Sequence, residues 1–223
     1  MSENLQQDEL AMVEFAANPD PRCPCVLILD TSASMDGAPI AALQNGLQVF
    51  QADIRKNTLA QRRVEVAIIS FGPNGAEVSQ DFVTAGQFEP PTLKAEGGTP
   101  IGDAINLALD LVHERKTTYK AAGIAYYRPW VFMITDGQPT DDWQGSAQRI
   151  KQEEANKSVA FFVIGVEGAN MEVLEQLAVR KPLKLRGLQF AELFVWLSQS
   201  QQRVSASRPG DQIALLPPGW AEV

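Results

Sequence analysis

The sequence contains few of the residues from which several common kinds of site are built. Only two cysteines and one histidine occur among its 223 residues. Cys23 and Cys25 are one residue apart, a spacing that rarely meets disulfide geometry, and His113 lies in an unrelated segment. A zinc site needs at least three good ligands of this kind. We therefore expect two reduced thiols, no zinc site, and a surface position for the histidine.

Basic runs and long apolar runs are also missing. Lys and Arg number 19 against 27 Asp and Glu, so the net charge is −8 and nothing attracts nucleic acid or an anionic membrane. The acidic excess mildly favours cation binding, although solubility alone accounts for it. No apolar stretch approaches the roughly 20 residues needed to cross a bilayer, and residues 1–8 have no signal-peptide core. We expect a cytoplasmic protein with neither a nucleic-acid nor a membrane partner.

What the chain does contain is ordinary globular material, with 45% hydrophobic residues and strand-length apolar runs that alternate with amphipathic segments. The expected strands are 25–29, 64–71, 76–83, 130–135, 159–166 and 183–185, and the expected helices are 40–54, 101–112, 142–156, 171–177 and 190–197. This order predicts a three-layer α/β/α fold with a mostly parallel central sheet of about six strands. The run 76–83, after a turn signal, is the expected antiparallel edge strand.

One domain accounts for these elements. We expect an N-terminal extension over residues 1–22, a domain over residues 23–205, and an extended C-terminal tail over residues 206–223 that packs on the domain.

Oxygen-bearing side chains follow three of the expected elements. Asp30, Ser32 and Ser34 come directly after the first strand, Thr99 precedes the second helix, and Asp136 follows the strand 130–135. The carboxyl ends of parallel strands meet at one edge of a sheet, which is where ligands collect in such folds. In an extended turn, residues at i, i+2 and i+4 point the same way. The sequence therefore predicts that these five side chains converge.

Their chemistry indicates a hard divalent cation. Carboxylates and hydroxyls are hard oxygen donors, which suit Mg²⁺, with Mn²⁺ or Ca²⁺ as alternatives. With few charged ligands bound directly, the cation stays electron-poor and can draw a carboxylate from another molecule into an open position. We therefore expect a site that captures the Asp or Glu of a protein partner.

The constellation resembles the metal-ion-dependent adhesion site of von Willebrand factor A domains, whose pattern is D-x-S-x-S, then a Thr, then an Asp. The sequence carries Asp-Thr-Ser-Ala-Ser at 30–34, Gly-Gly-Thr-Pro at 97–100 and Thr-Asp-Gly at 135–137. The resemblance spans about residues 25–200 and implies that the two serines coordinate the metal directly, and the threonine and aspartates directly or through water. Ala33 stands where a glycine is common, which leaves every ligand in place.

A narrower likeness is to bacterial TerY-type proteins of tellurite-resistance and stress systems. It rests on Tyr-Tyr-Arg-Pro-Trp at 126–130, Thr-Asp-Gly-Gln-Pro-Thr-Asp at 135–141 and Leu-Phe-Val-Trp-Leu-Ser at 193–198. This resemblance implies a cytosolic, stand-alone A domain that works with a protein kinase and a PP2C-type phosphatase. It implies a pathway and establishes no reaction.

Simpler interpretations stay open for single residues. Asp30, Ser32 or Ser34 taken alone can cap a turn, and Thr99 before a proline can cap a helix. The neighbouring acids Asp36, Asp141 and Asp142 are expected to be solvated loop or helix-start residues. The aromatic segment 126–130 is expected to pack in the core, with a partner contact as the alternative.

Three functions from different classes remain. The first is a non-enzymatic, metal-dependent adaptor. The second is a Mg²⁺-dependent phosphohydrolase, since an aspartate after a first strand also begins aspartate-nucleophile phosphatases. Those enzymes need a second carboxylate two residues later as acid and base, and here Ser32 holds that place. The third is a scaffold in which the metal only stabilises the fold. No G-x-x-x-x-G-K-[ST] motif occurs, so P-loop chemistry has no support.

Overall fold

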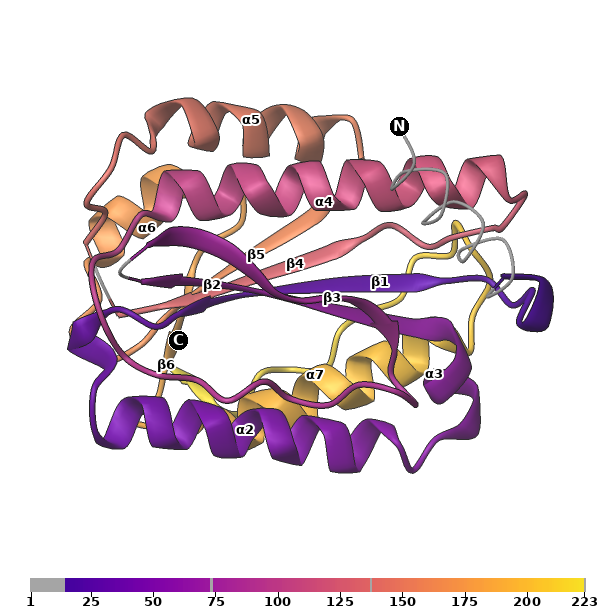
Figure 1. The fold of residues 1–223 in the computed structure, drawn as a ribbon, viewed down its shortest axis with the longest axis horizontal. Coiled ribbons are helices and arrows are strands. Elements are labelled where there is room, and N and C mark those ends of the chain that lie inside the picture. Colours follow the sequence, from indigo (N-terminus) through magenta and orange to yellow (C-terminus); the bar gives the residue numbers. More distant parts are fainter. Residues whose placement is uncertain (1–14, 73, 137, 223) are drawn as a thin grey trace.

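The structure, a computed structural model, describes residues 15–72, 74–136 and 138–222. The strands are β1 (Cys23–Asp30), β2 (Val64–Gly72), β3 (Gly75–Thr84), β4 (Trp130–Thr135), β5 (Ala160–Gly165), β6 (Leu183–Leu185) and β7 (Ala221–Glu222). The helices are α2 (Ala38–Ile54), α3 (Thr58–Arg63), α4 (Ile101–Ala121), α5 (Gln144–Ala155), α6 (Met171–Leu177) and α7 (Phe190–Ser205), with a 3-10 turn η1 (Ala33–Met35). Figure 1 shows the sheet between two helical layers, with α4, α5 and α6 on one face and α2, α3 and α7 on the other.

The sheet runs in the order β3-β2-β1-β4-β5-β6-β7. β1 is parallel to both β2 and β4, and the parallel pairing continues through β5 to β6. This confirms the predicted three-layer fold, its parallel centre and the antiparallel edge strand β3. The prediction of about six strands was short by one, because β7 pairs antiparallel with β6 and makes a second antiparallel edge. A strand of two residues is too short to show a periodic pattern.

Two further elements differ from the prediction. The short helix α3 was not expected, although Asn57 caps it by accepting hydrogen bonds from the backbone N–H groups of Leu59 and Ala60. Helix α4 was expected to end near residue 112 and continues to Ala121. Its polar last third shows no apolar period, yet Tyr119 on that segment is fully buried.

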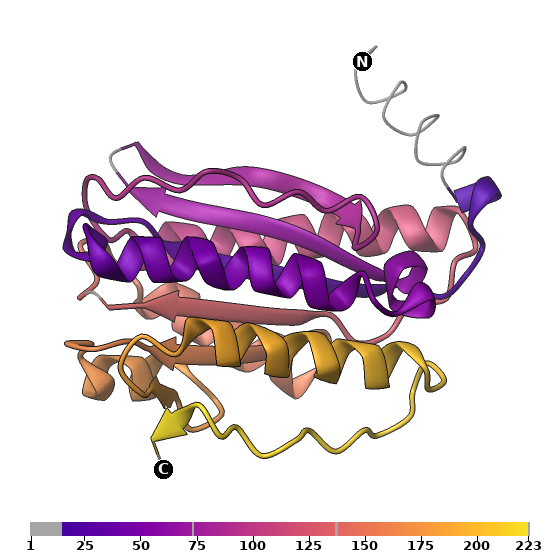
Figure 2. The ribbon, with the colours of Figure 1, turned by 90° about the horizontal axis from the view of Figure 1, so that it is seen from below.

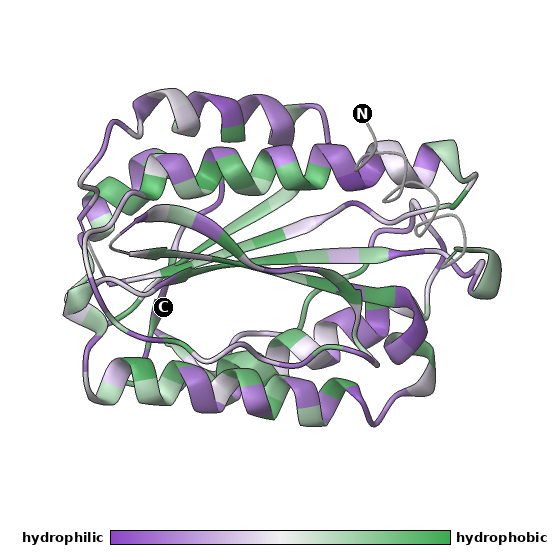
Figure 3. Ribbon diagram, in the orientation of Figure 1, coloured by the Kyte–Doolittle hydropathy of each residue, from purple (hydrophilic) through white to green (hydrophobic). Residues whose placement is uncertain are grey.

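The two faces of β1 supply two hydrophobic cores. Every residue of β1 is buried, as expected for a strand covered by helices on both faces. Cys25 and Leu27 belong to the core beneath α2 and α7, and Val26 and Ile28 belong to the core beneath α4. Figure 3 shows the corresponding apolar stripes on the sheet and on the inner sides of the helices. Both cysteines are buried and neither forms a disulfide in the structure.

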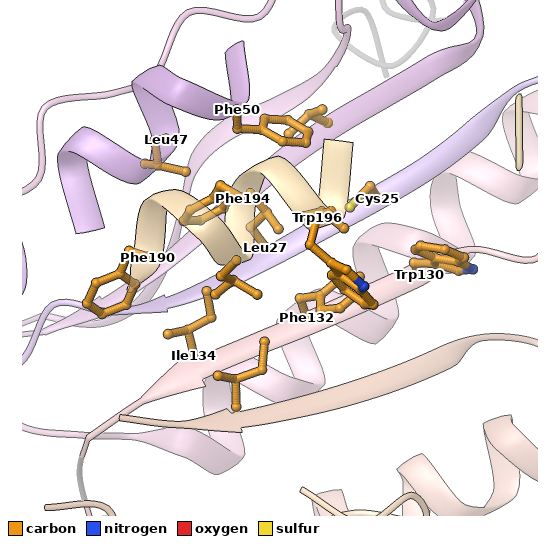
Figure 4. Close-up of a cluster of buried hydrophobic side chains, with 14 of the residues drawn as sticks. Cys25, Leu27, Leu47, Phe50, Trp130, Phe132, Ile134, Phe190, Phe194 and Trp196 are labelled. Carbon is orange, nitrogen blue, oxygen red and sulfur yellow. The ribbon is translucent and has the colours of Figure 1, made fainter. Parts of the chain in front are cut away.

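The core beneath α7 is rich in aromatic rings (Figure 4). Phe194 packs on Phe50 with ring centroids 6.0 Å apart, and Trp196 meets Phe132 edge to face. Gly46 of α2 allows this close packing, because a Cβ there would lie 2.6 Å from the Phe194 ring. Trp130 of the predicted aromatic segment is buried in this core, as expected.

Buried arginine–carboxylate clusters hold the amino end of the sheet. Glu65 near the start of β2 pairs with the fully buried Arg22 at 2.9 Å and with Arg115 of α4 at 2.8 Å, and it accepts a hydrogen bond from the Tyr119 hydroxyl. In this cluster one carboxylate lies between two guanidinium groups. The charge removed from water on folding is therefore paired.

A second cluster repeats the arrangement beside β5. Glu154 pairs with Arg128 at 2.6 Å and with Arg180 at 2.8 Å. It also accepts a hydrogen bond from the backbone N–H of Phe161. The Glu154 side chain is 5% exposed, so this carboxylate too is desolvated and neutralised by arginine.

The chain after α7 crosses the sheet as an extended segment, residues 206–222, which we call the C-terminal strap (Figure 2). At its start, Tyr127 donates a hydrogen bond to the carbonyl of Ser207. Near its far end, the Trp196 indole N–H donates to the carbonyl of Leu216 at 2.8 Å, and β7 joins β6. The strap thus covers a part of the sheet that α7 leaves uncovered.

Within the described residues, no helix combines the length and apolar character needed to cross a membrane.

Candidate metal site at the carboxyl end of the sheet

Asp30 is the last residue of β1, and its side chain organises the turn that follows. Its Oδ1 atom accepts hydrogen bonds from the Ser32 backbone N–H at 2.9 Å and from the Ser32 hydroxyl at 2.5 Å. The backbone of Ser32 is extended, and its hydroxyl can therefore reach back to the aspartate two positions earlier. The carboxylate is completely buried.

The strand β4 brings the second carboxylate to the same place. Leu29 of β1 is in register with Ile134 of β4, so the two strands end side by side. The Oδ2 atom of Asp30 accepts hydrogen bonds from the Thr135 hydroxyl at 2.6 Å and from the Asp136 backbone N–H at 3.3 Å. Both oxygens of Asp30 are thereby oriented.

The serine hydroxyls connect the two aspartates. Ser32 Oγ lies 2.9 Å from Ser34 Oγ, and Ser34 donates a hydrogen bond to Asp136 Oδ1 at 2.8 Å. A continuous chain of polar contacts therefore runs from Asp30 through both serines to Asp136. The structure brings four of the five predicted site residues into this cluster, which joins positions separated by more than one hundred residues.

The fifth predicted residue, Thr99, is buried on the adjoining loop. That loop is tied to the turn after β1, since Ala33 N–H donates to Gly97 O at 3.1 Å and Glu96 N–H donates to Thr31 O at 2.8 Å. Among the contacts of the described residues, no hydrogen bond joins the Thr99 hydroxyl to the other four. Thr99 thus lies beside the cluster without bonding to it.

Thr140 and Asp141 were not selected from the sequence as site residues, yet they hold the Thr99 loop. Thr99 N–H donates to Thr140 Oγ1 at 3.1 Å, and Thr140 N–H donates to Thr99 O at 3.0 Å. The Asp141 carboxylate accepts hydrogen bonds from the N–H groups of Gly102 at 3.1 Å and Asp103 at 2.9 Å. The loop after β4 therefore clamps the start of α4.

This clamp corrects two interpretations. The N-cap position of α4 is Pro100, so Thr99 is not the cap, and the orphan amides of the first turn are satisfied by Asp141 instead. Asp141 is accordingly more than a solvated acid. The approach of the two loops is close, because a Cβ at Gly102 would lie 2.6 Å from the carbonyl oxygen of Asp142. The motif at 135–141 was visible in the sequence, but the contact of its Thr140 with Thr99 was not.

The other acids and the histidine behave as predicted. Asp36 and Asp142 are exposed, and Asp142 accepts a hydrogen bond from Gln144 N–H at the start of α5. His113 is exposed on α4. Within the described residues, no three side chains of the His, Cys, Asp or Glu type gather as a metal site. The predicted site differs from such groups, because three of its five ligands are hydroxyls. Gly137 of the third motif lies outside the described residues, as do residues 1–14 of the predicted N-terminal extension.

The electrostatics of the cluster are unbalanced. None of the ion pairs found among the described residues includes Asp30 or Asp136. Burial, and then repulsion from Asp30, raises the pKa of Asp136 from 3.8 to about 6. Two carboxylates without a counter-charge and the nearby hydroxyls of Ser32 and Ser34 fit the donor preferences of a hard divalent cation, which would supply the missing positive charge.

The sequence also matches a known family. The von Willebrand factor type A domain matches residues 25–186, and the chain belongs to this family. That span includes all five predicted site residues. The resemblance noted from the three motifs is thereby confirmed at the level of the domain family. A comparison with curated proteins gives no match.

Solved structures of similar fold come from varied settings. Proximal thread matrix protein 1 of the mussel byssus has a TM-score of 0.57 at 19% identity, over 82% of this chain and 49% of that one. The pilus adhesin SpaC of Lactobacillus rhamnosus GG has a TM-score of 0.63 at 13% identity, over 83% and 30%. The vWF domain of the type V pili tip protein Mfa5 of Porphyromonas gingivalis has a TM-score of 0.57 at 10% identity, over 86% and 99%.

These likenesses concern the fold. The chain spans about half of the mussel protein and less than a third of SpaC, while it spans nearly all of the Mfa5 domain. At these identities the comparison supports the three-layer architecture. The functions of those whole proteins are not transferred to this chain.

Proposed function

We propose that the protein is a non-enzymatic, metal-dependent protein-binding module, with Asp30, Ser32, Ser34, Thr99 and Asp136 holding a divalent cation. The carrying observation is the fully buried Asp30 carboxylate, which lies in one polar chain with Asp136 and has no ion pair among the described residues. A buried carboxylate in this position is costly unless a cation compensates it. Membership of the von Willebrand factor type A family supports a role in protein interaction.

The chain's own residues prepare such a site before any ligand arrives. Thr135 and the Ser32 backbone N–H orient the Asp30 carboxylate, and the serine chain sets the position of Asp136. A bound Mg²⁺, or Mn²⁺ or Ca²⁺ in its place, would supply an electron-poor centre for the Asp or Glu of a protein partner. Partner binding at such a site needs no proton transfer.

Two features support a binding role over hydrolysis. The residue two positions after Asp30 is Ser32, whose hydroxyl does not ionise near neutral pH and so cannot replace a carboxylate as general acid and base. That hydroxyl is also engaged, 2.5 Å from Asp30 and 2.9 Å from Ser34. The aspartate-nucleophile reaction therefore lacks its acid and base.

The cellular setting is part of the same proposal. The motifs at 126–130, 135–141 and 193–198 resemble TerY-type proteins, so we place the chain in the cytoplasm, in a tellurite-resistance or stress-response system with a kinase and a PP2C-type phosphatase. One of these is the expected source of the partner carboxylate. The adhesin and pilus-tip structures of similar fold support protein binding in general.

An affinity pull-down tests the proposal. Full-length protein with a C-terminal tag is used as bait in native lysate, with Mg²⁺ or with EDTA, beside Asp30→Ala and the exposed-acid control Asp142→Ala. The expected result is a partner that binds wild type and Asp142→Ala in Mg²⁺ only, and does not bind Asp30→Ala. A partner that binds equally in EDTA and to folded Asp30→Ala refutes the proposal.

A structural role for the metal is the second candidate, favoured by the position of the site between the ends of β1 and β4. Asp136→Ala separates the two roles when melting and binding to the recovered partner are measured together. Lost Mg²⁺-dependent stabilisation with unchanged partner affinity supports the structural role. Lost affinity in a protein that remains folded supports capture.

A further inference from the structure

A cavity of about 740 Å³ lies at the amino end of the sheet, opposite the metal site. Its inner wall is formed by the starts of β4 and β5, including Trp130 and Phe162, and its outer wall by residues 210–213 and 215 of the C-terminal strap. The strap is attached on either side of this stretch, at Ser207 and at Leu216, so it bridges the cavity. The volume falls in the range of small-molecule sites.

The cavity wall is cationic, although the protein as a whole has a net charge of −8. Lys116, Lys157, Arg128 and Arg180 line it, against one lining acid, Asp211. The charges of the two arginines are offset by Glu154, which pairs with both, and by Asp211, so the positive excess of the wall comes from Lys116 and Lys157. Such a concentration of one sign in a concave site attracts the opposite sign.

Lys116 carries a charge with only neutral hydrogen-bond partners. Its Nζ donates to Ser158 Oγ at 2.6 Å and to Ser158 O at 3.4 Å. Burial lowers the pKa of Lys116, against the attraction of Glu153. Lys157 is exposed. Its φ is +55°, so the short turn before β5 holds it in a backbone conformation that is rare for residues other than glycine.

The remaining wall is apolar. Trp130 and Val204 are buried in the adjacent core, and Ile213 and Leu215 of the strap are partly buried. A ligand in this cavity would therefore meet cationic groups on one side and apolar or aromatic surface on another. Few polar groups beside an apolar surface are what orient small ligands in their sites.

We propose that this cavity binds a small organic anion: a carboxylate, phosphate or sulfonate group on an aromatic or aliphatic body. Lys116 and Lys157 receive the anionic group, and Trp130 with the strap residues Ile213 and Leu215 covers the apolar body. The site is independent of the metal site, which lies at the other end of the parallel strands.

The probe for the test is 8-anilinonaphthalene-1-sulfonate, an aromatic anion, titrated into full-length protein and followed by its fluorescence and by calorimetry. Its neutral relative N-phenyl-1-naphthylamine is titrated in parallel. The test variant is Lys116→Met with Lys157→Met, and the matched control is Lys56→Met with Lys151→Met, two exposed lysines outside the cavity that give the same change in net charge. Circular dichroism checks that each variant is folded.

The expected result is one equivalent of bound sulfonate, with affinity lowered at least about tenfold in the test variant and unchanged in the control, because charge-assisted contacts are lost only in the former. The neutral relative binds at least about tenfold more weakly, and EDTA has no effect. Equal binding of the neutral relative, or equal loss of affinity in both folded variants, overturns the proposal. A requirement for Mg²⁺ also overturns it, whatever becomes of the metal-site proposal.

Discussion

At the amino end of the sheet Glu65 and Glu154 each lie between two arginines, whereas at the carboxyl end Asp30 and Asp136 meet through serine hydroxyls. Both ends remove carboxylates from water. Among the described residues, only the amino end supplies the opposite charge from the chain itself.

Under the proposed function, this difference separates two roles that look alike in a sequence of 27 acidic residues. Carboxylates that the chain neutralises itself join strands and helices. Carboxylates that pair with no cation of the described chain would be left for an external ion to neutralise. The pKa of Asp136, raised to about 6 by burial and by Asp30, is the electrostatic sign of that deficit.

The sharpest test of the comparison is Glu65→Gln. This change leaves the fully buried Arg22 without its carboxylate, and breaking a buried ion pair in this way costs about 3–5 kcal/mol. Urea unfolding followed by tryptophan fluorescence measures the loss. Glu89→Gln is the control, since Glu89 pairs with Arg55 in solvent and its removal is expected to leave the midpoint unchanged. Equal effects of the two changes would show that the amino-end cluster is not structural.

Removal of the Asp136 charge at the carboxyl end is expected to change stability differently in a buffer with Mg²⁺ and in a buffer with EDTA. Wild type in Mg²⁺ at about one hundred times its dissociation constant gains roughly 2.7 kcal/mol over EDTA by mass action. Asp136→Asn is expected to lose that gain and, in EDTA, to be at least as stable as wild type, because the repulsion with Asp30 is gone. Thermal melting in both solvents measures this. Wild type and variant with the same Mg²⁺ response would contradict the assignment.

The pH dependence of stability in EDTA sharpens the same point. The folded-state pKa of Asp136 is raised, so the folded protein holds this proton more tightly than the unfolded chain does. Its contribution to stability is therefore present below about pH 4 and is lost as the pH rises to about 6. The loss is expected to stay below about 2 kcal/mol, because the half-buried group is screened by solvent.

Other carboxylates titrate in the same range, so the quantity to measure is the stability of wild type minus that of Asp136→Asn between pH 4 and 7. This difference is expected to fall as the pH rises. A flat difference would show that Asp136 is not perturbed.

The smallest expected effect concerns the clamp on the Thr99 loop. Asp141→Ala removes the two hydrogen bonds that its carboxylate accepts from the first turn of α4, and it is expected to cost about 1 kcal/mol, as the loss of a helix cap does. It is also expected to weaken Mg²⁺ binding severalfold, because Thr99 is held by the same loop. Calorimetric Mg²⁺ titration measures the affinity. The control Asp142→Ala removes only a contact to Gln144, and an equal loss in both variants would rule out the clamp.

Much of the fold was predictable, because its signals are local. The continuous apolar runs of β1, β2, β4 and β5 and the 3.6-residue period of α2 and α7 follow from burial of each element by its neighbours. The antiparallel β3 was visible as a turn followed by alternation. Strand β7 and the course of the strap depend on pairing with β6 and on Trp196, contacts that no local pattern encodes.

The candidate site divides in the same way. Asp30, Ser32 and Ser34 share one turn, and Asp136 could be placed beside them because parallel strands end at one edge. The roles of Thr135, Thr140 and Asp141 escaped the prediction, since each bonds to a residue far away in the sequence, on another element or loop. The arginine pairs on Glu65 and Glu154 escaped it as well, because their members lie on three separate elements.

The two antiparallel edge strands have a consequence for association between copies. β7 is only two residues long, and β3 carries the exposed acids Glu77 and Asp81 and register shifts in its pairing with β2. Short, charged or irregular edges are poor templates for adding a strand from another molecule. Sheet extension into fibres is thereby disfavoured at both borders of the sheet, so association between copies is not expected to proceed by strand addition.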